Sequence, residues 1–198
     1  MEKISQSIVD FIRRNMTIDD EEMLDVYKYG IEITLSSLIN FIIIIVSSLL
    51  IKDLAAGLIF MACFILLRSY TGGYHAETYW RCNTAFMCTF ILTYCVSKLF
   101  DYISLNAYIV TALLLFGIIP IIKLSPVKNR HKFLSESKRK KSRVISLILY
   151  TLFSVVSIVL CEINIQYGYL ILTTILSVSI LILVEVFMQS KGYHVSNN

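Results

Sequence analysis

The stretch ITLSSLINFIIIIVSSLLI, residues 33–51, contains no charged residue. A helix that crosses the hydrocarbon core of a bilayer needs roughly 20 predominantly apolar residues, so this stretch is long enough to span a membrane. Only 16% of the 198 residues are charged, whereas a soluble domain carries about 25%. The mean hydropathy is +0.72. These values predict an integral membrane protein.

Five further uncharged runs follow along the chain, at 54–67, 83–97, 102–122, 144–161 and 163–184. The runs at 54–67 and 83–97 are short for a membrane span. Because they lie within a series of spans, we interpret both as spans that take additional residues from the polar stretch between them. The sequence therefore predicts six transmembrane helices in a single domain that covers residues 1–198.

The distribution of basic residues predicts the orientation of these spans. With a cytoplasmic N-terminus, the cytoplasmic segments hold four, two, nine and one of the 18 Lys and Arg residues, and only Lys52 and Lys98 face outside. This bias is the one expected for cytoplasmic loops. We therefore expect an all-α polytopic membrane protein with both termini in the cytoplasm. The four cytoplasmic segments are 1–32, 68–82, 123–143 and 185–198.

The N-terminal residues 1–15 follow a different pattern. Ile4, Ile8, Phe11 and Ile12 recur at helical spacing, with polar residues between them. This spacing predicts an amphipathic helix. On a cytoplasmic N-terminus, such a helix is expected to lie at the interface of the inner leaflet.

The polar stretch RSYTGGYHAETYWRC, residues 68–82, contains a candidate nucleophile and base, Cys82 and His75. A thiol is activated when an adjacent imidazole takes its proton. On a straight helix the two side chains would lie about 10.5 Å apart along the axis, whereas proton transfer needs roughly 3 Å. The chain must therefore bend, and Gly72-Gly73 can break the helix before His75. An incidental His and Cys at the membrane interface is the alternative interpretation.

Together with SPVKNRHKFLSESKRKKSR at 125–143, this stretch resembles the AgrB family, the accessory gene regulator B peptidases of Gram-positive quorum sensing. The resemblance extends to the size of the chain, its several spans and its amphipathic start. It implies that Cys82 is the nucleophile and His75 the catalytic histidine. Arg68 and Gly73 match the arginine and the second glycine of the family motif.

The resemblance also implies a function. The implied protein is a membrane cysteine endopeptidase that cleaves the C-terminal tail of a quorum-sensing pro-peptide through an acyl-enzyme thioester. It is also expected to promote thiolactone cyclisation of the autoinducing peptide. The implied partner is an AgrD-like pro-peptide with an acidic C-terminal tail. The oligomeric state is left open, with a homodimer as one alternative. No cofactor is expected. The implied location is the cell membrane of a Gram-positive bacterium, with the active site on the cytoplasmic side.

The loop 123–143 carries nine basic residues and one acidic residue, Glu136. It can act as a topology signal that also touches anionic lipid. It can also dock an acidic substrate tail electrostatically. The best candidates for docking form the run Lys138, Arg139, Lys140 and Lys141. A run this short, next to two membrane spans, does not favour binding of nucleic acid.

Three other features leave alternatives open. Cys82, Cys88 and Cys95 are spaced unlike the ligands of a structural zinc site, so no metal is predicted. Glu185 lies in the last span, but near enough to the polar end of the chain that we expect it to reach water. A small transporter or export subunit for a peptide or ion would use the same spans without a nucleophile, and it is the alternative function.

Overall fold

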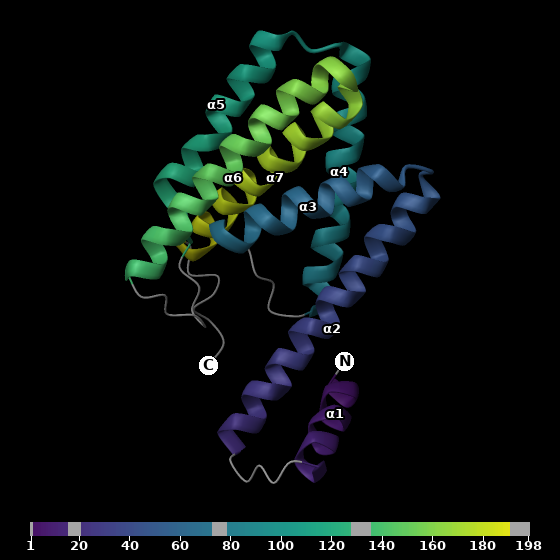
Figure 1. Cartoon of the computed structure of the whole chain (residues 1–198), viewed down its shortest axis with the longest axis vertical. Coiled ribbons are helices and arrows are strands. Elements are labelled where there is room, and N and C mark those ends of the chain that lie inside the picture. The colour runs from purple at the N-terminus through teal and green to yellow at the C-terminus, as the bar shows by residue number, and fades with distance from the viewer. Residues whose placement is uncertain (1, 16–20, 73–78, 128–135, 191–198) are drawn as a thin grey trace.

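The computed structural model describes residues 2–15, 21–72, 79–127 and 136–190, and every regular element in these ranges is an α-helix (Figure 1). The helices are α1 (Glu2–Asn15), α2 (Glu21–Leu50), α3 (Leu54–Thr71), α4 (Tyr79–Ile103), α5 (Ala107–Leu124), α6 (Glu136–Ile163) and α7 (Ile165–Ser190).

The six helices α2 to α7 are each long and apolar enough to cross a membrane, which confirms the predicted all-α polytopic fold with six spans. The N-terminal residues Glu2–Asn15 form the helix α1. It packs against α2, with Val9 buried and Phe11 exposed. Its place on the inner leaflet and the cytoplasmic location of both termini stay predictions.

The two short predicted spans are lengthened by the polar stretch between them, as expected. α3 continues to Thr71 and α4 starts at Tyr79, so both take residues from 68–82. The boundary between α4 and α5 differs from the prediction. The uncharged run starts at 102, but α5 begins only at Ala107, because the Asn106 side chain accepts a hydrogen bond from the backbone N–H of Tyr108 at 3.0 Å and caps the helix.

At one end of the bundle the connections are short, at 51–53, 104–106 and 164. Asp53 organises this end. Its Oδ1 caps α3 by accepting from the backbone N–H of Ala56 at 3.0 Å, and it also accepts from the Tyr167 hydroxyl at 3.1 Å. Its Oδ2 accepts from Gln166 Nε2 at 3.1 Å. The turn between α2 and α3 is thereby joined to the start of α7.

α7 is the central helix of the bundle and contacts α3, α4, α5 and α6. It is buried on several sides, with Leu170, Leu172 and Ile175 fully enclosed. Because lipid tails are as apolar as leucine, the hydrophobic effect contributes little to association between helices in a membrane. Close packing and hydrogen bonds between helices must hold these elements together.

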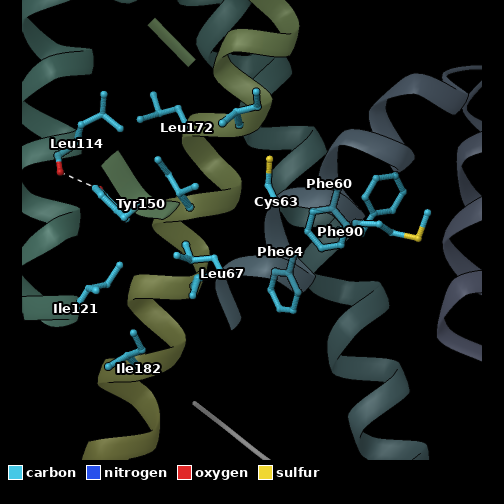
Figure 2. Packing of buried hydrophobic residues seen from close by; sticks show 14 of the residues in the cluster. Phe60, Cys63, Phe64, Leu67, Phe90, Leu114, Ile121, Tyr150, Leu172 and Ile182 are labelled. Carbon is cyan, nitrogen blue, oxygen red and sulfur yellow. Dashed lines mark hydrogen bonds between the residues drawn. The ribbon is translucent and has the colours of Figure 1, made fainter. Parts of the chain in front are cut away.

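Three hydroxyl groups supply such hydrogen bonds where helices approach closely. Ser157 of α6 donates to the Gly168 carbonyl at 2.7 Å, and Ser179 of α7 donates to the Gly117 carbonyl at 2.7 Å. The buried Tyr150 hydroxyl donates to the Leu114 carbonyl at 2.8 Å (Figure 2). Two of the three acceptors are glycines, whose lack of a side chain lets the backbones approach.

An aromatic cluster joins α3 to α4. Phe60 stacks on Phe64 with ring centroids 5.2 Å apart, and both rings contact Phe86 of α4 at 5.4 and 5.1 Å. Phe90, also on α4, lies 5.1 Å from Phe60 (Figure 2). This cluster fixes the two helices that flank the polar stretch, and Phe64 and Phe86 also line the cavity described next.

Candidate active site

A cavity of about 860 Å³ lies between α2, α3 and α4. This volume is within the range of small-molecule and cofactor sites. Its walls are mostly apolar, with Phe41 and Met61 among them, but Cys82 and Arg68 also line it. The remaining polar side chains of the wall come from Thr34, Ser37, Asn40, Ser69, Tyr70, Thr89 and Ser142.

Cys82 and Arg68 reach this cavity from two different helices. Cys82 is half-buried in the first turns of α4, and Arg68 is half-buried in the last turn of α3. The Arg68 guanidinium lies over the Phe64 ring, 5.5 Å from its centroid, and it interacts electrostatically with Cys82. A positive charge next to a thiol favours the thiolate, which is the nucleophilic form.

Gly72 ends α3 and separates these two residues. Its φ of 70° is in the left-handed region, which favours glycine, and its N–H donates to the Arg68 carbonyl at 3.0 Å. The neighbouring Thr71 carbonyl accepts from the N–H of Val127 at 3.1 Å. The helix therefore ends at Gly72, the first glycine of the predicted pair. Gly73 and His75 lie outside the described residues.

The segment after α5 closes the same end of the cavity. Pro126 and Val127 line it, as does Ser142 of α6. Ser125 anchors this segment, because its carbonyl accepts from Arg143 Nε at 2.7 Å and its hydroxyl lies 3.3 Å from that of Ser146.

The residues Lys138–Lys141, which we call the basic start of α6, immediately precede Ser142. Its three lysines are exposed and Arg139 is half-buried. Figure 1 shows the start of α6 at the same end of the bundle as the ends of α3 and α5. The structure thus brings together the predicted thiol, the predicted arginine and the predicted docking residues at one end of the molecule.

Asn83 is a candidate that the sequence reasoning missed. It is buried directly after Cys82, and its Oδ1 accepts from the Ser36 hydroxyl of α2 at 2.9 Å. One turn further along α2, Asn40 lines the cavity. Asn83 is the first residue of a run predicted to be an apolar span, so the sequence alone gave it no functional role. Its role in joining α2 to α4 depends on a hydrogen bond with a residue 47 positions away. This hydrogen bond joins α2 to α4 beside the thiol.

Glu185 of α7 corrects one expectation. We expected it to reach water, but it is 7% exposed. Its Oε1 accepts from Gln189 Nε2 at 2.8 Å, and the charges of Glu185 and Arg68 interact. The expectation was wrong because the distance to the chain end along the sequence says nothing about which face of α7 the side chain occupies. A carboxylate within an apolar run was the available signal.

Fold and site together define a multi-pass α-helical membrane protein with a thiol and a guanidinium in one cavity. The chain also matches the family described as Accessory gene regulator B, AgrB, over residues 5–187, and therefore belongs to that family. No solved structure matches it.

Related proteins agree with this assignment. An AgrB-like protein of Lactiplantibacillus plantarum is 27% identical over 191 residues, which cover 96% of this chain and 90% of that protein. AgrB-like protein 2 of Clostridium perfringens is 25% identical over 171 residues, or 81% of this chain and 78% of that protein. Protein FsrB of Enterococcus faecalis is 34% identical over 80 residues, or 38% of this chain and 33% of that protein.

Family membership supports general statements about the role and the location of the protein. It supports a role in a quorum-sensing accessory gene regulator system. The family processes peptides, and membership implies interaction with a pro-peptide substrate such as AgrD. The apolar helices and the family together give a multi-pass membrane protein of Gram-positive bacteria.

Proposed function

We propose that the protein is a membrane cysteine endopeptidase that cuts the C-terminal tail from an AgrD-like pro-peptide and promotes closure of the thiolactone ring. Cys82 is the nucleophile and His75 the general base, with Arg68 and Gly73 in supporting roles. The observation that carries this proposal is the cavity in which Cys82 and Arg68 meet from opposite sides of the helix break at Gly72.

The proposed reaction has two acyl transfers. His75 takes the proton from Cys82 Sγ, and the thiolate attacks the carbonyl carbon of the scissile peptide bond. The carbon–nitrogen bond breaks, His75 returns the proton to the leaving amine, and the core peptide remains as a thioester on Cys82. A cysteine of the core peptide then attacks this thioester. The thiolactone forms, and Cys82 is released as a thiol.

The two steps differ in their energetics. Exchange of one thioester for another changes the free energy little, whereas conversion of an amide to a thioester is uphill. Removal of the released tail therefore has to pull the first step forward. The basic start of α6 offers a physical means, because its four cations directly precede the cavity-lining Ser142, where they would attract an acidic tail and hold it apart from the acyl-enzyme.

Water competes with the cysteine of the core peptide for the acyl-enzyme, and hydrolysis would give a linear product. The half-buried position of Cys82 in a mostly apolar cavity supports exclusion of water. A bulky, membrane-impermeant thiol reagent should therefore label Cys82 slowly in inside-out vesicles on the proposed cytoplasmic side. Fast labelling would contradict a recessed site.

The decisive experiment co-expresses the chain with the small peptide encoded next to its gene and follows the products by mass spectrometry. Cys82→Ser and Cys82→Ala should both abolish cleavage, and the wild type should carry a peptide adduct at Cys82 that hydroxylamine removes. Cys88→Ala is the matched control, because Cys88 lies on the same helix but is exposed and outside the cavity wall. It should cleave normally.

The same variants test the alternative function. A transporter or export subunit needs no nucleophile and would tolerate at least one of the two Cys82 substitutions. Retained peptide maturation in either variant would therefore reject the peptidase mechanism.

A further inference from the structure

Glu185 is the buried carboxylate of α7, and its surroundings do not explain its burial. It is 7% exposed, and of its two oxygens only Oε1 has a hydrogen bond, from Gln189. Oε2 is buried, and none of the described residues donates a hydrogen bond to it. A carboxylate removed from water is costly unless an opposite charge compensates it.

Arg68 is a cation whose charge interacts with this carboxylate. α3 and α7 pack against each other, and the Arg68 guanidinium interacts electrostatically with the Glu185 carboxylate. Leu181, one turn before Glu185, lines the same cavity as Arg68. The interaction crosses a protein interior of low dielectric, where charges attract more strongly than in water.

Arg68 therefore has two anionic neighbours of different kinds. Cys82 is negative only as a thiolate, and it loses that charge when it is protonated or acylated. The Glu185 carboxylate takes no part in the proposed acyl transfers, so this neighbour of Arg68 is the same before and after acylation of Cys82. Acylation of Cys82 removes one of these two neighbours and leaves the other, Glu185, in place.

We infer that Glu185 is the permanent counter-ion of Arg68 and holds the guanidinium in the cavity whether or not Cys82 carries a charge. Glu185 is thus a positioning residue that acts through Arg68, and its effect on catalysis rests on the proposed peptidase function.

A double-mutant cycle with Arg68→Gln and Glu185→Gln tests this inference. Residues in one charged network are coupled, so the effects of the two substitutions should not add. We expect Glu185→Gln alone to lower the cleavage rate by about tenfold, which is within the coupling energies measured for such pairs. In the Arg68→Gln background, Glu185→Gln should cause no further loss. A further tenfold loss there would show that Glu185 acts independently of Arg68, and the inference would be overturned.

Thermal unfolding in detergent gives a second readout that needs no substrate. Each single variant removes one of the two interacting charges and should melt at a lower temperature, whereas the double variant should recover much of the loss. If the double variant is as unstable as the two losses combined, the pair does not exist. Glu162→Gln, on an exposed residue, is the matched control and should leave both readouts unchanged.

The two readouts separate this inference from the proposed function. A wild-type protein that does not cleave any pro-peptide through Cys82 would refute the peptidase proposal, and the unfolding cycle would still decide whether Glu185 and Arg68 are paired. Normal cleavage by the wild type, together with unaltered cleavage by Glu185→Gln, would refute the inference and leave the peptidase intact.

Discussion

Replacement of Gly168 by alanine tests how tightly α6 and α7 are packed. A Cβ built at Gly168 would lie 2.5 Å from Cys161 Sγ, 2.6 Å from the Cys161 backbone nitrogen and 2.9 Å from its Cα. Ordinary van der Waals contacts of this kind begin at 3.4 Å. Because two of the three atoms belong to the backbone, a change of rotamer cannot relieve the clash, and the helices must separate.

The cost follows from three terms. Overpacking of a well-packed interior costs about 1–3 kcal/mol. Separation of the helices also weakens the hydrogen bond from Ser157 to the Gly168 carbonyl, worth about 0.5–1.5 kcal/mol. Alanine favours a helix over glycine by about 1 kcal/mol, which offsets part of the loss. We expect Gly168→Ala to lower the free energy of unfolding by about 0.5–3.5 kcal/mol, which combines these three terms.

Unfolding of the purified protein by a denaturing detergent, followed by circular dichroism, measures this loss. Gly30→Ala is the matched control, because a Cβ there meets nothing within 4 Å, so its stability should stay equal or rise slightly. Cys161→Ala in the Gly168→Ala background removes only the sulfur contact and should restore only a minor part. Equal stability of Gly168→Ala and Gly30→Ala would refute the argument from close approach.

Three further substitutions test other contacts. Tyr150→Phe removes the hydrogen bond to the Leu114 carbonyl and should cost about 0.5–1.5 kcal/mol in the same unfolding assay, whereas Tyr102→Phe, on a side chain that is 89% exposed, should cost nothing. Asp53→Ala removes the cap of α3 and should cost about 0.5–2 kcal/mol for the cap alone; an unchanged melting curve would contradict this role. Replacement of the three lysines in the basic start of α6 by glutamate should weaken pro-peptide processing most at low salt, where charge attraction is least screened. Unchanged processing at every salt concentration would leave these lysines a role in topology or lipid contact only.

The fold could be predicted from the sequence because each span is an uncharged run bounded by charges. The start of α5 was predicted wrongly, because Asp101, which bounds the uncharged run, lies within α4. The residues 102–105 continue the apolar pattern, and the start of α5 depends on a single side chain, Asn106, that caps the helix. A hydropathy pattern carries no information about a hydrogen bond that caps a helix.

The candidate site was predictable only in part. The cluster of polar residue types in 68–82 indicated Cys82 and Arg68, and the glycine pair indicated the break between them. The roles of Asn83 and Glu185 depend on contacts with residues far away in the chain, Ser36 and Arg68. No periodicity within one helix reveals which residue of another helix it will face. His75 lies outside the described residues, and its role stays a prediction.

The short connections at 51–53, 104–106 and 164 have a consequence for how the protein meets its surroundings. Loops of this length expose little chain beyond the bilayer. A partner, antibody or protease that approaches from that side therefore has few accessible residues to bind. Recognition has to occur at the opposite face or sideways through the lipid. The molecule is in this sense one-sided, and insertion of a tag into any of these three turns should disturb the bundle more than a tag elsewhere.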